Sequence, residues 1–360
     1  MAVQYTLTDV FKVVAKQNAS DVYVTPNSPP LLRIKNDFHP IKGGPLTVEE
    51  CNKLILDTMN PAQQEEFIRE KDFDYALNIP GVGRFRINVY QASGAYEMVA
   101  RLIAENPRPL SDLYLPEKIG KIVEKHHNGL IVVAGATGSG KSSTLAGMID
   151  LINSTQKKKI VTIEDPIEIV HKNKLSSISQ RELYADTNDF KVALKSAMRQ
   201  RPDVILIGEM RDKDTVTTAL NAAESGHLVF STLHSINAQE TIARILDFYP
   251  VNEQQQIRNL LAQTIRAIIC QRLIVNNDNE TRPLVEIMTQ NLRTKEAIRD
   301  EEKSHNLHEI MKSGTIDHMQ TFESHLIEMV SDDILTADMA LKYTDNADEL
   351  KREFRNARLI

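Results

Sequence analysis

The segment "GLIVVAGATGSGKSST", residues 129–144, decides the fold of this chain. It opens with an apolar run typical of a buried β-strand and continues into the motif G-x-x-x-x-G-K-[ST], Gly135–Ser142. Glycines let the backbone wrap closely around a phosphate group with its N–H groups pointing inward. The positive end of a following helix adds to that attraction. The segment therefore predicts a strand, a phosphate-binding loop and a helix in succession.

The same motif identifies the residues that we expect to hold a triphosphate. Lys141 can reach the β- and γ-phosphates, and the hydroxyl group of Ser142 can ligate Mg²⁺. ATP and Mg²⁺ are accordingly the predicted cofactors. The expected nucleotide-binding residues are Gly135, Thr137, Gly138, Ser139, Gly140, Lys141, Ser142 and Ser143.

Short apolar runs alternate with helical patterns from about residue 119 to residue 290. Strands that are apolar on both faces are typical of a mostly parallel sheet covered by helices, so this region predicts an α/β domain. The runs are "GLIVVAG" at 129–135, "KIVTIE" at 159–164, "DVILIG" at 203–208 and "HLVFSTL" at 227–233.

The regions on either side have a different character. Residues 1–104 mix strand and helix patterns and predict a small α+β domain, in which Thr47 and Glu50 form the capping signal of one helix. Three prolines make residues 105–118 an extended connector. Residues 291–360 are polar and helix-rich, and they predict a C-terminal helical region that follows the 119–290 domain.

Acidic residues follow two of the apolar runs. Open α/β sheets bind their ligands at the carboxyl ends of the strands, so Glu164, Asp165 and Glu209 should share one edge. Gly208 stands where a P-loop hydrolase usually carries a Mg²⁺-binding aspartate. We expect Glu209 in the metal or water shell and Glu164 to polarise water, while either glutamate could be the base. An acid at a strand end is otherwise a helix cap or a surface charge.

The sequence "GHLVFSTLH", 226–234, puts His227 and His234 at opposite ends of one strand. At ~3.3 Å per residue they lie over ~20 Å apart, which argues against a shared metal ion. Both side chains could cap or fill the core. The alternative is that His234, at the carboxyl end, senses the γ-phosphate.

A second strand, "GRFRINV" at 83–89, alternates apolar residues with arginines, so that Arg84 and Arg86 share the face away from the core. Such a face is most often solvated. If another subunit's nucleotide lies opposite, however, these arginines could neutralise transition-state charge. Further candidates flank the acidic strand, namely Arg199, Arg201 and Arg211.

The composition narrows the possible functions. A net charge of −6 and a pI near 6.0, without a basic or aromatic stripe, predict that nucleic acid is not a partner. Cys51 and Cys270 are too far apart for a CxxC site and fit a reducing compartment. The apolar runs fall short of the ~20 residues that cross a bilayer. We expect a cytoplasmic protein that is at most peripheral to a membrane.

Together these segments resemble the secretion ATPase superfamily, and most closely the type IV pilus retraction ATPases, the PilT and PilU group. The similarity covers most of the chain, and four ordered motifs carry it. They are "GATGSGKSST" (135–144), which resembles the Walker A motif, "TIEDPIE" (162–168) the Asp box, "GEMRD" (208–212) the Walker B motif and "AAESGHLVFSTLH" (222–234) the His box.

This resemblance implies a PAS-like N-terminal domain, a RecA-like ATPase domain and a homo-hexameric ring with ATP at the subunit boundary. It implies that Glu209 and Glu164 are the catalytic carboxylates and that Arg84 and Arg86 reach the neighbour's nucleotide. It also implies that His227 and His234 belong to the His box. Hydrolysis would turn part of an inner-membrane pilus platform protein and drive pilus retraction and twitching motility.

Two departures refine the comparison. The chain lacks the cysteines of the four-cysteine zinc module found in extension and secretion relatives. Its tail, "LHEIMKSGTIDHMQTFESHL" at 307–326, is closer to PilU, which favours an accessory motor with a sister retraction ATPase as a further partner. The competing hypotheses are a RecA-like nucleic-acid translocase and an ATP-gated scaffold with little turnover.

Overall fold

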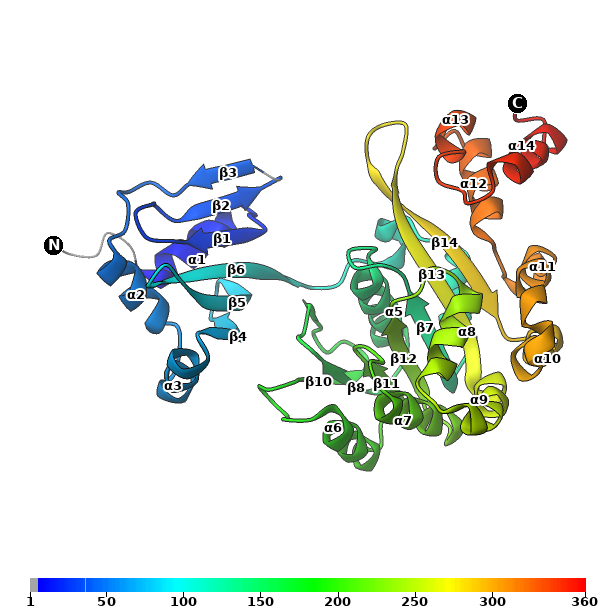
Figure 1. Ribbon diagram of the computed structural model, residues 1–360, viewed down its shortest axis with the longest axis horizontal. Coiled ribbons are helices and arrows are strands. Elements are labelled where there is room, and N and C mark those ends of the chain that lie inside the picture. The colour runs from blue at the N-terminus through cyan, green and yellow to red at the C-terminus, as the bar shows by residue number, and fades with distance from the viewer. Residues whose placement is uncertain (1–5, 36) are drawn as a thin grey trace. The chain divides into compact units, whose positions relative to one another are not determined.

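The computed structural model describes residues 6–35 and 37–360, which form two compact units. The first unit contains the chain up to Asn106 together with Glu168–Val170, and the second contains Pro107–Ile167 and His171–Ile360. Each unit combines helices with a sheet (Figure 1). The predicted α/β class, with an N-terminal domain ahead of a P-loop domain, is confirmed.

The first unit is built on a largely antiparallel sheet with the strand order β3-β2-β1-β6-β5-β4. Phe11 on helix α1 packs against Phe85 on β5, with the ring centroids 4.4 Å apart, in the core between helix and sheet. The elements are α1 (Leu7–Lys16), β1 (Asp21–Val24), β2 (Leu31–Ile34), β3 (Asp37–Pro40), α2 (Val48–Leu56), α3 (Pro61–Glu70), β4 (Asp72–Ile79), β5 (Gly83–Ala92) and β6 (Ala95–Glu105).

Helix α2 begins at the capping signal in the sequence. The Thr47 side chain accepts a hydrogen bond from the backbone N–H of Glu50, and the Glu50 carboxylate accepts one from the backbone N–H of Thr47 at 2.9 Å. These two bonds satisfy N–H groups that the first turn of a helix leaves unpaired. The sequence therefore located this helix start correctly.

One short strand of the first unit comes from the middle of the other. Strand β9 (Ile169–Val170) pairs in parallel with the end of β6, with Ala104 opposite Ile169 and Glu105 opposite Val170. The chain thus enters the first unit for Glu168–Val170 and then returns to the second. Sequence patterns gave no sign of this excursion.

The second unit is a seven-stranded sheet with the order β10-β8-β11-β12-β7-β13-β14. All neighbouring strands are parallel except β13 and β14, which form an antiparallel pair at one edge. The strands are β7 (Gly129–Ala134), β8 (Lys159–Glu164), β10 (Ser177–Glu182), β11 (Val204–Ile207), β12 (Leu228–Leu233), β13 (Ile265–Val275) and β14 (Thr281–Thr289).

Helices cover both faces of this sheet, which is why its central strands are apolar on both sides. On β7, Leu130 and Val132 join one core cluster while Ile131 and Val133 join the other. Helices α4 (Glu117–Lys125) and α5 (Lys141–Thr155) lie on one face. The other face is covered by α6 (Phe190–Ala197), α7 (Lys213–Glu224), α8 (Ala238–Asp247) and α9 (Val251–Thr264).

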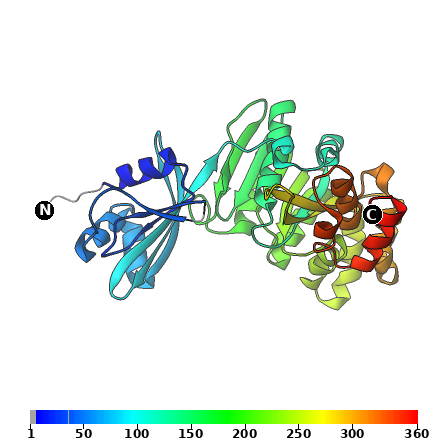
Figure 2. The same cartoon turned by 90° about the horizontal axis from the view of Figure 1, so that it is seen from above.

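The C-terminal residues are helical, as predicted, and they belong to the second unit. Arg272 on β13 stacks 4.4 Å from the ring of Phe322 and pairs with Asp345 at 3.0 Å. Figure 2 shows the last helices gathered beside the β13–β14 hairpin. The helices are α10 (Leu292–Arg299), α11 (Leu307–Lys312), α12 (Phe322–Ser331), α13 (Ala337–Ala340) and α14 (Ala347–Asn356).

The connector differs from the extended chain that its prolines predicted. It contains a short 3₁₀ helix at Leu110–Leu113, and its last two residues already belong to α4. Across residues 6–35 and 37–360, the structure contains no helix with both the length and the apolar character that a membrane span needs.

Candidate active site

The phosphate loop connects β7 to α5, as the sequence predicted. Strand β7 ends at Ala134, α5 begins at Lys141, and Gly140 caps the helix with φ +90°. A Cβ atom on Gly140 would lie 2.7 Å from Nε2 of Gln271 on β13. The backbone angle favours glycine at this position, and any larger residue would also displace the end of the Gln271 side chain.

Polar groups in the loop are arranged for an anion. The hydroxyl group of Ser139 is buried and has no hydrogen-bond partner among the described residues. The Lys141 ammonium group donates to the carbonyls of Gly135 and Ala136, both at 2.9 Å. At Gly138, where φ is +79°, an added Cβ would meet open space. A buried hydroxyl, an ammonium group and an open glycine turn fit a phosphate group.

Gln271 on β13 supports the phosphate loop, and the sequence did not predict this role. This side chain is buried, and its Oε1 atom accepts a hydrogen bond from Thr144 Oγ1 at 2.7 Å. Thr144 is on the first turn of α5, so the bond ties the phosphate-loop helix to β13. The predicted loop residues Thr137, Ser142 and Ser143 lie on the exposed or half-buried side.

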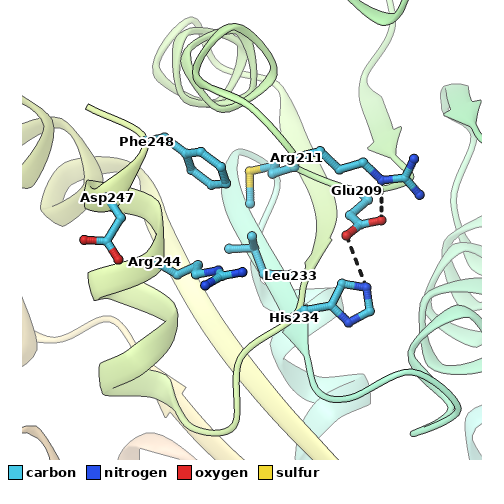
Figure 3. A pocket seen from close by; sticks show the side chains of 8 residues that line it. Glu209, Arg211, Leu233, His234, Arg244, Asp247 and Phe248 are labelled. Atoms are coloured by element: carbon cyan, nitrogen blue, oxygen red, sulfur yellow. Dashed lines mark hydrogen bonds and ion pairs between the residues drawn. The ribbon is translucent and has the colours of Figure 1, made fainter. Parts of the chain in front are cut away.

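Glu209 follows β11 and has a partner for each carboxylate oxygen. Its Oε2 atom accepts a hydrogen bond from Nε of Arg211 at 2.6 Å, and its Oε1 atom lies 3.2 Å from Nε2 of His234 (Figure 3). His234 follows β12, so side chains from two adjacent strand ends meet at this carboxylate. The structure thus brings together two of the predicted site residues.

Arg211 also joins Glu209 to the neighbouring strand end. Its guanidinium group donates to Oδ2 of Asp165 at 2.9 Å, directly after β8. Asp212 caps α7 instead, since its side chain accepts from the backbone N–H of Thr215. Arg211 therefore links the carboxylates that follow β8 and β11.

Glu164, the last residue of β8, is held from two sides. Its Oε1 atom accepts a hydrogen bond from Thr162 Oγ1 at 2.6 Å and another from Gln180 Nε2 at 3.1 Å. Gln180 is on β10, the neighbouring edge strand. Sequence analysis anticipated Glu164 but neither of the groups that orient it.

The glycine after β11 has a packing reason. A Cβ atom at Gly208 would lie 3.3 Å from Cα of Glu164 and 3.3 Å from the carbonyl oxygen of Ile163. The backbone N–H of Gly208 donates to that same carbonyl at 2.8 Å. A side chain at this position would therefore crowd the backbone of β8, and the carboxylate comes one residue later.

Other histidine and arginine candidates lie elsewhere. Nδ1 of His227, at the opposite end of β12 from His234, lies 3.1 Å from the carbonyl oxygen of Ala222 in α7, which favours a capping role. Arg199 and Arg201 precede β11 and lie at its far end from Glu209. The structure thus removes these three from the carboxyl edge.

Arg84 and Arg86 lie on β5 of the first unit. Phe85 and Ile87 are buried, whereas Arg84 is half-buried and Arg86 is exposed. The predicted alternation along this strand is therefore confirmed. Both arginines face away from the core of their own unit.

A hollow of about 360 Å³ opens beside Glu209 (Figure 3). The strand-end residues lie on one side of it, and α8 with the residue that follows supplies the other side. Arg244, Asp247 and Phe248 were not anticipated, because nothing in the sequence places α8 opposite the acidic strand end. The lining residues are Glu209, Met210, Arg211, Leu233, His234, Arg244, Asp247 and Phe248.

A phosphate loop between a central strand and a helix, below acidic ends of parallel strands, defines a P-loop protein with a RecA-like domain. A family model for type II/IV secretion system proteins matches residues 2–357. The chain belongs to the type II/IV secretion system protein family.

Individual relatives cover almost the whole chain. The Pseudomonas aeruginosa pilus retraction ATPase PilT is 37% identical over 93% of this chain and 96% of its own, and PilU of that species is 34% identical over 95% and 89%. A crystal structure of the pilus retraction motor PilT with bound ADP superposes with a TM-score of 0.89 at 36% identity, covering 97% of this chain and 100% of that one. Overall identity therefore does not separate the PilT and PilU types.

Proposed function

We propose that this protein is a hexameric ATPase motor that powers type IV pilus retraction. The observation that carries the proposal is the contact of Glu209 with His234 at the carboxyl ends of the parallel strands, the same end at which β8 finishes with Glu164 and β7 leads into the phosphate loop. The relatives named as type IV pilus ATPases, of which PilT is named as a retraction ATPase, and the ADP in the PilT crystal structure support ATP as the nucleotide.

The phosphate loop binds the triphosphate in this proposal. Backbone N–H groups at the start of α5 and the Lys141 ammonium group attract the β- and γ-phosphates. Mg²⁺ is usually bound through one or two protein oxygens together with phosphates, and the Ser142 hydroxyl and the Glu209 carboxylate supply such oxygens. When bound, the ion would neutralise phosphate charge.

Glu164 and Glu209 have different roles in the proposed hydrolysis. Glu164, fixed by Thr162 and Gln180, orients and polarises the attacking water. Glu209 lies in the metal and water shell, and His234 beside it responds to the γ-phosphate. Arg84 and Arg86 act on the nucleotide of the neighbouring protomer, where a fixed positive charge stabilises the transition state.

The proposed partners follow from this role. The protomers form a homo-hexameric ring that is cytoplasmic and peripheral to the inner membrane at the pilus base. There it acts on the pilus platform protein. The tail at residues 307–326 supports an accessory role of the PilU kind beside a sister retraction ATPase.

Phosphate release by the purified full chain tests the biochemical proposal. We expect ATP hydrolysis that DNA does not stimulate, and loss of both ATP binding and hydrolysis in Lys141→Ala. Binding without turnover would instead indicate an ATP-gated scaffold. Stimulation by single- or double-stranded DNA would indicate a translocase.

Pilus dynamics in cells test the biological role. Cells that lack only this gene should show weaker retraction and twitching than the parent, and cells that also lack the sister gene should show none. Unchanged motility under load after deletion of this gene would contradict a retraction role. Full retraction without the sister motor would contradict the accessory assignment.

A further inference from the structure

The return of the chain from β9 leads directly to the candidate site. Glu168–Val170 belong to the first unit, where the carbonyl oxygen of Val170 accepts a hydrogen bond from the backbone N–H of Asn106 at 3.3 Å. The next residue, His171, belongs to the second unit. A single peptide bond therefore joins a strand of the first unit to the segment beside β10.

Two hydrogen bonds continue from this point to the carboxylate at the end of β8. The backbone N–H of His171 donates to Oε1 of Gln180 at 2.7 Å. Nε2 of the same Gln180 side chain donates to Oε1 of Glu164 at 3.1 Å. The parallel pairing of β10 with β8 sets Gln180 opposite Thr162, two residues before Glu164.

The chemistry of an amide makes this arrangement directional. A glutamine side chain has one acceptor end and one donor end. Because the His171 N–H takes the acceptor end, the donor end faces Glu164. All three residues are half-buried, where hydrogen bonds are less weakened by water than at an open surface.

We propose that Gln180 is a positioning residue for Glu164, and that it ties the orientation of this carboxylate to the place of β9. The inference rests on the function proposed above, in which Glu164 orients the attacking water. If the backbone at His171 shifts because β9 no longer pairs with β6, the acceptor end of Gln180 loses its donor and its amide no longer holds Glu164 in place. Hydrolysis thereby depends on the pairing of β9 with β6.

Steady-state ATP hydrolysis by the full-length protein provides the first test. Gln180→Met keeps the size of the side chain but removes both bonds, and we expect kcat to fall by about tenfold to a hundredfold with KM and ATP affinity unchanged. Gln180→Glu should also lose turnover, since it sets a second carboxylate beside Glu164. The exposed Gln200→Met is the matched control and should behave as wild type.

A double-mutant cycle tests the link to β9. Val170→Pro removes a backbone N–H from the short strand and should lower kcat; Val170→Gly replaces it if the proline variant does not fold. If the two sites act in series, combining either change with Gln180→Met should reduce kcat no further than the larger single effect. If the double variant instead lowers kcat by the product of the two single effects, the two sites act independently and the proposed coupling is wrong.

The outcomes separate this inference from the proposed function. A wild-type protein that does not hydrolyse ATP contradicts the function and this inference with it. Wild-type turnover together with a normal kcat in Gln180→Met contradicts the inference alone. Melting temperatures of all variants, recorded beside the kinetics, distinguish misplacement of Glu164 from loss of the fold.

Discussion

At the scale of single residues, Glu209 differs from an ordinary strand-end acid because both of its carboxylate oxygens are held by neighbouring side chains. Arg211 and His234 contact its two oxygens, and its side chain is only 20% exposed. Groups that are fixed in advance need little reorganisation when charge develops in a transition state. This arrangement favours a catalytic role over a structural one.

Replacing this carboxylate tests that role. Glu209→Ala should leave ATP binding nearly intact, because the phosphate loop is unchanged, but should lower kcat by about a hundredfold or more. Nucleotide titration and phosphate release measure the two quantities. Glu224→Ala, at the exposed end of α7, is the control. Turnover within a few-fold of wild type would show that Glu209 does not act in the reaction.

A second carboxylate, Glu286, leads to a prediction about stability. Glu286 on β14 is buried and accepts a hydrogen bond from the backbone N–H of Ala238, the first residue of α8. Burial is the main cause that raises the pKa of Glu286 to about 7, Glu323 raises it further, and Arg272 and the Ala238 bond oppose the rise. The folded protein therefore binds a proton more readily at this site than the unfolded chain.

This pKa shift gives a signed prediction. Between the ordinary glutamate pKa of 4.5 and about 7, the folded state holds the extra proton, so the free energy of unfolding falls as the pH rises. Glu286→Gln keeps an acceptor oxygen and should remove this fall, which is on the order of 3 kcal/mol. Urea unfolding at pH 5 and pH 8 measures it. Exposed Glu302→Gln should follow the wild type.

At the scale of elements, the sequence predicted those features that are determined by residues close together in the chain. The phosphate loop and the start of α2 depend on residues only a few positions apart, and both were predicted correctly. The strand ends with Glu164 and Glu209 followed from apolar runs and the geometry of parallel sheets. The phosphate loop, the helix cap and the strand ends depend on neighbouring residues, so a single sequence is enough to predict them.

The remaining features depend on residues that are distant in the sequence. Gln271 reaches the phosphate loop from more than a hundred positions away, and Gln180 reaches Glu164 only because β10 pairs with β8. Strand β9 is two residues long, and its pairing with β6 leaves no periodic pattern. Such contacts follow from strand order, which one sequence does not specify.

The close approach of β11 to β8 leads to a prediction about Gly208. Gly208→Ala would set a methyl group 3.3 Å from the backbone of Glu164, so we expect a loss of about 1–3 kcal/mol in stability and a lower kcat. Gly120→Ala in α4 is the matched control. Its methyl group would meet Leu151 at 3.7 Å, and it should be neutral or stabilise by up to ~1 kcal/mol.

Thermal unfolding and steady-state kinetics check both variants. A Gly208→Ala protein with wild-type stability and turnover would show that β8 can yield without disturbing Glu164. A destabilised Gly120→Ala would instead show that alanine is poorly tolerated throughout this unit. A loss of stability or turnover in Gly208→Ala but not in Gly120→Ala would therefore be caused by the crowding between β8 and β11.

At the scale of the whole molecule, the arginines of β5 and the carboxylate at the end of β11 belong to different units. In the proposed ring, one protomer supplies Glu209 and its neighbour supplies Arg84. Each single variant then spoils every site of a uniform ring, whereas a mixed ring contains some intact sites.

Mixing subunits tests this arrangement. Arg84→Ala and Glu209→Ala proteins should each be inactive, and mixtures should regain part of the wild-type hydrolysis because some boundaries pair an intact arginine with an intact carboxylate. A mixture of Arg84→Ala with Arg86→Ala should stay inactive, since both changes fall on one side of the boundary. Mixtures without any recovery would place Arg84 outside the neighbour's site.

The glycine between β11 and Glu209 has a consequence for recognising similar proteins. Surveys that identify nucleotide hydrolases by an aspartate closing an apolar strand would pass over this chain. The tight spacing of β8 and β11 crowds a side chain at that position, and the acid comes one residue later. A more reliable criterion asks whether neighbouring strands leave room for a side chain, and then looks for the carboxylate just beyond the point where they do not.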